Sequence, residues 1–260
     1  VCELQNSESN LAGDFNLFDK SAEYNLPTED QEALVLHTSG TTSRPKIVPL
    51  SNKNIYSSAE NISESLNLTF KEHCLNIMPL FHIHGLIAVL AASMKVGASV
   101  CASSGFNALK FLDNAKREKI TWYSGVPTMH QAILMRADKN KETAKNLSLR
   151  FLRSSSASLP PAVFKKLNQV FNCPVIEAYG MTEATHQMTS NPMPPKLQKA
   201  GYVGIPAGPE VCIMDRSNKI LDQGEEGEVC IKGENVTSGY ENNPDANKNS
   251  FSNGWFRTGD

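Results

Sequence analysis

Short apolar runs alternate with longer amphipathic stretches over residues 32–178. The amphipathic stretches repeat apolar residues at the three- and four-residue spacing of a helix, as Ile55, Ala59, Ile62 and Leu66 do. Strands are predicted at 32–37, 74–79, 98–102, 120–124, 150–154 and 174–178, and helices at 51–66, 84–96, 106–118, 127–138 and 160–171. This alternation predicts an α/β fold with a mostly parallel sheet that is covered by helices on both faces.

Polar segments lie at the ends of several of these strands. They are 37–46, 81–84, 154–158 and 179–183. Ligands of open parallel sheets bind beyond the carboxyl ends of the strands, so we expect these four segments to converge on one site. The first segment is expected to join the buried strand 32–37 to the helix that begins at Ser51.

The pattern changes on either side of this region. Residues 1–30 are polar and weakly patterned, which is typical of a linker or of the remnant of an upstream segment. After Gly201, short strand-like runs at 209–215 and 226–232 stand between glycines and prolines, and the asparagine-rich stretch 242–250 is expected to form a helical or loop connection on the surface. We therefore divide the chain into a segment 1–30, an α/β core 31–200 and a β-rich portion 201–260.

Composition excludes several classes of protein. The chain is 40% hydrophobic and 20% charged with a net charge of −2, which is typical of a globular protein. No run of lysines and arginines with interleaved aromatics suggests a nucleic-acid surface. The longest apolar stretch, 86–96, contains Ser93 and Lys95 and is too short to cross a bilayer, so we expect no membrane insertion. The six cysteines form no C-x-x-C pair and are expected to be reduced, as in an intracellular protein.

The segment 38–46 is suited to binding phosphate. Its hydroxyls belong to Thr38, Ser39, Thr41, Thr42 and Ser43, its glycine is Gly40, and its cations are Arg44 and Lys46. Hydroxyl and backbone N–H donors can surround a polyphosphate, and a glycine lets the backbone come close. The segment is not the common nucleotide-binding loop, because Ile47 follows the lysine where serine or threonine is required. Taken alone, it could also be a polar surface turn.

Other polar residues have structural interpretations. Glu183 could be a first-turn helix acid, which the helix dipole favours. Ser158 could cap a helix ahead of Pro160. His82 and His84 make a poor metal site because no third ligand is near them, and His84 is expected to be a structural residue at the start of a helix.

Five blocks of the sequence resemble the motifs of the adenylate-forming superfamily, in that family's order. The superfamily includes acyl-CoA synthetases, luciferases and the adenylation domains of peptide synthetases. The blocks are 36–50, 78–85, 179–183, 227–233 together with 239–240, and 254–260, so the resemblance covers nearly everything after residue 30. It implies that the β-rich portion belongs to a distorted β-barrel. It also implies that the family's small C-terminal domain, which carries a catalytic lysine, is absent after Asp260, so we expect these residues alone to bind ATP weakly and to be nearly inactive.

The resemblance implies an AMP-forming acid–CoA ligase that uses ATP, Mg²⁺ and coenzyme A. It assigns catalysis to Thr182, Glu183 and His82, with Glu183 also holding the metal. In this assignment Tyr179 packs against adenine and Asp260 binds the ribose. The nucleotide-binding residues would be Thr38, Ser39, Gly40, Thr41, Thr42, Ser43, Lys46, Ser156, Ala157, Glu177, Ala178, Tyr179, Thr182 and Asp260. A carboxylate is already ionised at pH 7, so adenylate formation needs no general base.

The stretch 181–186, with 190–192 after it, resembles the oxalate–CoA ligase branch of the superfamily. The expected pocket wall, 153–158 and 182–186, is polar, so a fatty chain would gain little there, whereas Ser156, His82 and His186 could pair with the second carboxylate of a small acid. We therefore expect oxalate to be activated. A medium-chain or aromatic acyl-CoA ligase, an amino-acid adenylation domain and a catalytically incomplete ATP-binding fragment are the alternatives.

One position departs from the family pattern. Ile47 stands where glycine is usual, and a backbone conformation open to glycine could be closed here. The branch includes peroxisomal-type enzymes, and a peroxisomal address would lie beyond Asp260, so the expected compartment is the cytoplasm or the peroxisome.

Overall fold

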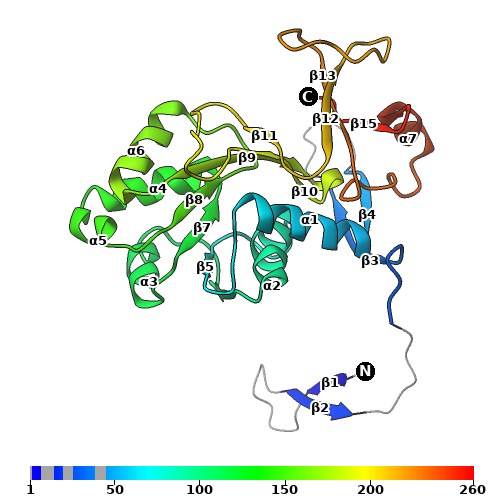
Figure 1. Ribbon diagram of the computed structural model, residues 1–260. Coiled ribbons are helices and arrows are strands. Elements are labelled where there is room, and N and C mark those ends of the chain that lie inside the picture. The colour runs from blue at the N-terminus through cyan, green and yellow to red at the C-terminus, as the bar shows by residue number, and fades with distance from the viewer. Residues whose placement is uncertain (1, 7–14, 20–25, 39–44) are drawn as a thin grey trace.

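The computed structural model describes residues 2–6, 15–19, 26–38 and 45–260. Its centre is a seven-stranded sheet with the strand order β11-β10-β9-β8-β7-β5-β6 (Figure 1). The five parallel strands are β5 (His73–Asn76), β6 (Ser99–Ala102), β7 (Trp122–Gly125), β8 (Phe151–Ser154) and β9 (Val175–Met181). Two antiparallel strands extend the sheet beside β9, namely β10 (His186–Ser190) and β11 (Ile205–Pro206). The predicted α/β fold with a mostly parallel sheet is confirmed.

Helices cover both faces of this sheet, as the alternating pattern predicts (Figure 1). On one face lie α1 (Asn52–Ser65), the π-helical segment η1 (His84–Ala91) and α2 (Ala92–Lys95). On the other face lie α3 (Phe111–Arg117), α4 (Pro127–Ala137), α5 (Lys141–Lys145) and α6 (Pro161–Phe171). Each face of the sheet has its own hydrophobic core. Phe151 packs into the core on the side of α1, and its neighbour Leu152 packs into the core on the side of α4 and α6, because successive side chains of a strand point to opposite faces.

Local side-chain contacts set where the helices begin. Ser51 and Asn54 form a reciprocal capping box at the start of α1, in which Ser51 Oγ accepts the Asn54 N–H (3.1 Å) and Asn54 Oδ1 accepts the Ser51 N–H (2.9 Å). The helix predicted from residue 106 begins only at Phe111. Asn107 Oδ1 accepts the N–H of Leu109 (2.9 Å), so the intervening residues form a turn.

The prediction that 32–37 is a buried strand leading directly into a helix is wrong. This strand, β3 (Glu32–His37), pairs antiparallel with β4 (Ile47–Ser51) in a separate two-stranded sheet, and α1 begins only after β4. Only alternate residues of β3 are partly covered, and Val35 is 46% exposed. Pro49 obscured β4 in the sequence, because proline lacks a ladder donor and is found in edge strands rather than in central ones.

The β-rich portion is a four-stranded antiparallel sheet with the order β12-β13-β15-β14. The two strands predicted there are confirmed as β12 (Glu210–Met214) and β13 (Glu228–Lys232). The other elements are α7 (Pro244–Ser250), β14 (Phe251–Ser252) and β15 (Trp255–Arg257). None of the residues of α7 is buried, in agreement with the predicted surface connection.

The first 30 residues contain an antiparallel pair of strands that the weak pattern did not predict. These are β1 (Cys2–Asn6) and β2 (Phe15–Asp19).

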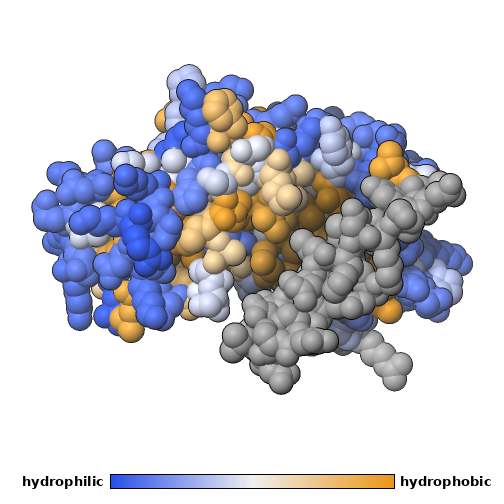
Figure 2. Space-filling model, turned by 90° about the horizontal axis from the view of Figure 1, so that it is seen from below, coloured by the Kyte–Doolittle hydropathy of each residue, from blue (hydrophilic) through white to orange (hydrophobic). Residues whose placement is uncertain are grey.

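The surface of the molecule is not uniformly polar. Seen from below the view of Figure 1, it has a hydrophilic margin and a central area where apolar side chains gather (Figure 2). Within the described ranges, no helix combines the length and the hydropathy that a membrane crossing requires.

Candidate functional site

A cavity of about 390 Å³ lies at the carboxyl end of β9. It is lined by Ser154, Ser156, Ala157, Ser158, Glu177, Ala178, Tyr179, Gly180, Met181, Gly201, Val203 and Asp260. Six of the predicted nucleotide-binding residues are among them, contributed by β9, by the loop after β8 and by residue 260. The structure therefore brings three separate parts of the sequence to one hollow, as expected for a site beyond the ends of parallel strands.

Tyr179 and Asp260 both line this cavity and are in contact with each other. The Tyr179 hydroxyl donates a hydrogen bond to Asp260 Oδ2. Burial raises the pKa of Tyr179 well above its usual value, so the phenol stays protonated and remains a donor. The backbone of Asp260 is also held, because its carbonyl accepts the N–H of Val229 (3.0 Å).

Other parts of the cavity lining come from the loop that follows β8 and from residues 177–178 of β9. Ser155 Oγ donates to the carbonyl of Ala178 (2.8 Å), which fixes this loop to the end of β9. Ser156 has a left-handed backbone, with a φ of 69°, which is uncommon for a residue other than glycine. Glu177 accepts the N–H of Gly201 (3.0 Å), and burial raises the pKa of its carboxyl.

A buried carboxylate lies just beyond the end of β9. Glu183, in a short 3₁₀ turn with the half-buried Thr182, accepts the hydroxyl hydrogen of Tyr240 at Oε1 (2.7 Å). The ammonium group of Lys46 stands over the ring of the same tyrosine, 4.4 Å from its centroid. Tyr240 thus links the end of the candidate phosphate loop to the predicted metal ligand.

The two ends of that loop are held together. The N–H of Thr38 donates to the carbonyl of Lys46 (3.0 Å), and the N–H of Lys46 donates to Thr38 Oγ1 (3.1 Å). Ile47 begins β4 and accepts the N–H of Glu241 (3.0 Å), so its extended backbone does not require glycine. The predicted phosphate ligands between them lie outside the described residues. They are Ser39, Gly40, Thr41, Thr42 and Ser43.

A cluster of histidines lies beside the cavity. His84 is fully buried at the start of η1, as predicted, with Nδ1 3.0 Å from Ser156 Oγ and Nε2 2.6 Å from Ser124 Oγ. The ring of His186 is 4.9 Å from that of His84, centroid to centroid. His82 is half-buried, and its Nδ1 accepts the N–H of His84 (3.1 Å). The three predicted substrate residues Ser156, His82 and His186 are therefore gathered around His84.

Arg153 gives this cluster its electrostatic character. Its side chain is fully buried, and burial lowers the pKa of the guanidinium to about 9, so it remains charged at neutral pH. Burial, together with the charge of Arg153, holds the pKa values of His84 and His186 well below the usual histidine value. The site at neutral pH is one buried cation among neutral imidazoles.

A third buried histidine, His130 on α4, predicts acid-sensitive stability. Burial lowers its pKa to about 4, so below the unfolded value of about 6.5 the unfolded chain takes up the proton first. The stabilisation is complete above pH 7 and is lost as the pH falls. Between pH 7.5 and pH 5, the unfolding free energy of the wild type is expected to decrease by about 2 kcal/mol more than that of His130→Gln, as measured by urea denaturation. An unchanged pH dependence in the variant would contradict this.

Residues 3–241 match the family model described as AMP-binding enzyme. The chain belongs to this family. It is 50% identical over 234 residues to an oxalate–CoA ligase of Arabidopsis thaliana, covering 89% of this chain and 45% of that protein. It is 48% identical over 230 residues to an oxalate–CoA ligase of Saccharomyces cerevisiae, covering 88% of this chain and 42% of that protein. The chain spans about half the length of the curated relatives it matches.

A solved structure of the O-succinylbenzoate coenzyme A synthetase of Bacillus subtilis, in complex with ATP and a magnesium ion, has the same fold. The TM-score is 0.82 at 31% sequence identity, and the match covers 93% of this chain and 50% of that one. The seven-stranded sheet and its helices are thus those of the AMP-binding family's large domain.

The sequence analysis assigned no role to two residues that lie close to the predicted ones. Arg153 belongs to the polar wall 153–158, but its burial was not predicted, because arginine is almost never fully buried unless it is paired. Tyr240 belongs to one of the recognised motifs, but nothing in the sequence indicates that its hydroxyl reaches Glu183.

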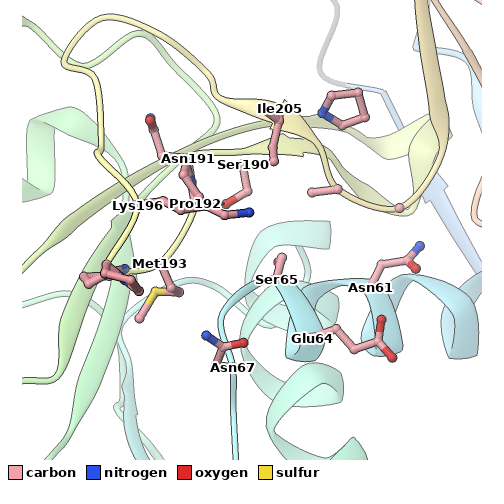
Figure 3. A pocket seen from close by; sticks show the side chains of 15 residues that line it. Asn61, Glu64, Ser65, Asn67, Ser190, Asn191, Pro192, Met193, Lys196 and Ile205 are labelled. Carbon is pink, nitrogen blue, oxygen red and sulfur yellow. Dashed lines mark hydrogen bonds between the residues drawn. The ribbon is translucent and has the colours of Figure 1, made fainter.

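A second, larger cavity of about 490 Å³ lies between α1 and the segment after β10 (Figure 3). Asn61, Glu64 and Ser65 face Ser190 and Asn191 across it. No predicted site residue in the described part of the chain lines this cavity. The convergence of predicted site residues, rather than volume, therefore identifies the candidate site.

Proposed function

We propose that the protein activates a small dicarboxylic acid, oxalate, with ATP to form an acyl adenylate and then transfers the acyl group to coenzyme A. The observation that supports this most directly is that the buried His84 and His186 lie beside Ser156, which lines the same cavity as Tyr179 and Asp260. An acid bound at the cluster would lie beside a nucleotide bound in the cavity. Such proximity is the main requirement for adenylate formation.

The cavity fits a nucleoside. Its volume lies within the range of about 300–1,000 Å³ that is usual for small-molecule sites. The ring of Tyr179 would pack against adenine, with Ser156 and Ala157 on the other wall. Asp260 would accept hydrogen bonds from the ribose hydroxyls, and its bond from Tyr179 holds the carboxylate in the cavity.

Glu183 fits the role of a magnesium ligand. Its carboxylate is buried and is oriented by Tyr240, as the ligands of metal ions commonly are by neighbouring groups. Bound Mg²⁺ would neutralise charge on the phosphates. Thr182, next to it, would donate to the α-phosphate, and the candidate phosphate loop that ends at Lys46 would hold the departing pyrophosphate.

The acid site suits a dianion better than a hydrocarbon chain. A hydrocarbon chain placed beside Arg153 and the histidines would offer no hydrogen-bond partner to Nε2 of His186, which has none among the described residues, and no opposite charge to the guanidinium. His82 would stand beside the reacting carboxylate, while Ser156 and His186 would bind the second one. Oxalate is also the acid named for the relatives in Arabidopsis and yeast.

A pyrophosphate-release assay on the full-length protein that contains this chain tests the proposal. Oxalate, malonate and octanoate are compared at equal concentrations with ATP, Mg²⁺ and coenzyme A. We expect oxalate to be used best and octanoate to be used poorly. Preference for octanoate would overturn the oxalate assignment and favour a medium-chain acyl-CoA ligase.

His186→Ala is expected to reduce kcat/KM for oxalate by about 10- to 100-fold while leaving the affinity for ATP nearly unchanged, because His186 touches the acid site and not the nucleotide cavity. Steady-state kinetics and calorimetric ATP titration measure the two effects. His130→Gln removes another buried histidine, on α4, and serves as the control. Equal losses of ATP binding and oxalate turnover in His186→Ala would contradict the assigned role.

A further inference from the structure

Arg153 is a buried cation without a carboxylate partner in the described part of the chain. None of the ion pairs found there includes it. Its guanidinium contacts only neutral groups: Nη1 is 3.4 Å from Ser124 Oγ, and Nη2 is 3.1 Å from Gln187 Oε1 and 3.5 Å from His186 Nδ1. A charge that is buried without an opposite charge destabilises the fold, so its presence calls for a functional explanation.

The contact with His186 fixes the tautomer of that histidine. A guanidinium can only donate, so Nδ1 of His186 must be the acceptor and the ring hydrogen must be on Nε2. Nε2 is buried and has no hydrogen-bond partner among the described residues. His186 therefore holds an unsatisfied N–H donor beside His84, and an anion bound at the proposed acid site would satisfy it.

A second series of hydrogen bonds leads from Arg153 to Ser156. Ser124 Oγ accepts from the guanidinium, and its own hydrogen goes to His84 Nε2 at 2.6 Å in preference to the carbonyl of Arg153 at 3.5 Å. The hydrogen of His84 is then on Nδ1 and is donated to Ser156 Oγ at 3.0 Å. Because Ser156 accepts this bond, its hydroxyl hydrogen is left to donate into the cavity that it lines.

We propose that Arg153 is a positioning residue that makes both Ser156 and His186 hydrogen-bond donors toward the second carboxylate of the acid, and that its charge selects acids with two negative charges. The inference rests on the proposed function. Arg153 acts through Ser124, His84 and His186 and is not expected to touch the acid. It differs in this from Ser156 and His186, which are expected to bind the second carboxylate directly.

The tautomers of His84 and His186 can be measured on the wild-type protein, and they test the proposed series of hydrogen bonds. In a long-range ¹H–¹⁵N correlation spectrum at pH 7.5, His186 is expected to carry its hydrogen on Nε2 and His84 on Nδ1. Arg153→Gln should convert His186 to a mixture of tautomers, because glutamine can accept as well as donate. The opposite tautomer of either histidine in the wild type would overturn the inference.

Substrate discrimination tests the consequence. Oxamate has the shape of oxalate but a single charge, so the ratio of kcat/KM for oxalate to that for oxamate measures selection for the second charge. We expect Arg153→Gln to lower this ratio by at least about 30-fold. Arg153→Lys, which keeps the charge but cannot reach both series of bonds, should give an intermediate ratio.

The matched control is Arg150→Gln, which removes the arginine that precedes β8 and pairs with Glu72 at 3.0 Å. It is expected to leave the ratio unchanged. An unchanged ratio in Arg153→Gln, with oxalate still preferred by the wild type, would overturn the role of Arg153 alone. A wild type that does not prefer oxalate would instead overturn the proposed function, so the two failures are distinguishable.

Discussion

Glu183→Gln is expected to lower kcat/KM for ATP in the full-length protein by at least about 100-fold. Glutamine keeps the size of the side chain and can still accept the hydrogen bond from Tyr240, but it removes the buried negative charge that would bind Mg²⁺. The concentration of Mg²⁺ needed for half-maximal rate should be higher in the variant than in the wild type. Pyrophosphate release, measured over a Mg²⁺ titration, shows both effects.

Two further measurements separate loss of the metal from loss of the fold. The melting temperature of Glu183→Gln should stay close to that of the wild type, and calorimetric titration should show weaker binding of ATP in the presence of Mg²⁺. Glu210→Gln, in an exposed position of β12, is the control and should behave as the wild type. A Glu183→Gln protein with normal Mg²⁺ dependence would contradict the metal assignment.

Gly180→Ala is expected to destabilise the protein by about 3 kcal/mol or more. A Cβ at this position would lie 1.7 Å from the carbonyl oxygen of His186, so β9 and β10 would have to move apart. The movement would displace His186 from Arg153 and distort the wall of the cavity. Urea denaturation measures the stability, and kcat/KM for oxalate should fall as well.

Gly125→Ala is the matched control for this prediction. Gly125 lies at the end of β7, and a Cβ there would meet its nearest neighbour, a ring carbon of His130, at the ordinary contact distance of 3.5 Å. The same substitution should therefore have little effect at Gly125. Similar stability of the two variants would show that β9 and β10 can separate without loss.

The parallel sheet was predictable because its strands are short apolar runs and its helices repeat apolar residues every three or four positions. Once the strands were located, their carboxyl ends, including the end of β9, could be assigned to the site. Pairing between strands was less predictable. β10 (His186–Ser190) is polar, so no apolar run marks it, and the fully buried Gln187 in it is satisfied by Arg153 and Ser65 rather than by apolar neighbours. β4 was concealed by Pro49.

The residues at the end of a strand were predicted, whereas the contacts between distant residues of the site were not. Tyr179 lies near the end of β9 and Glu183 lies just beyond it, and positions at the end of a strand can be inferred from sequence. The bonds from Tyr240 to Glu183 and from Arg153 to His186 join residues 57 and 33 positions apart. Such contacts depend on tertiary packing, which a single sequence does not show. The position of the Lys46 ammonium group over the ring of Tyr240 is another such contact.

In the proposed reaction, a carboxylate bound at the histidine cluster attacks the α-phosphorus of ATP bound in the adjoining cavity. Turnover of ¹⁸O-labelled oxalate by the full-length protein, followed by mass spectrometry of the released nucleotide, tests this step. Attack by the carboxylate and transfer of the acyl group to coenzyme A should leave one ¹⁸O atom in each AMP formed. Unlabelled AMP, or ADP as the nucleotide product, would contradict the proposed reaction.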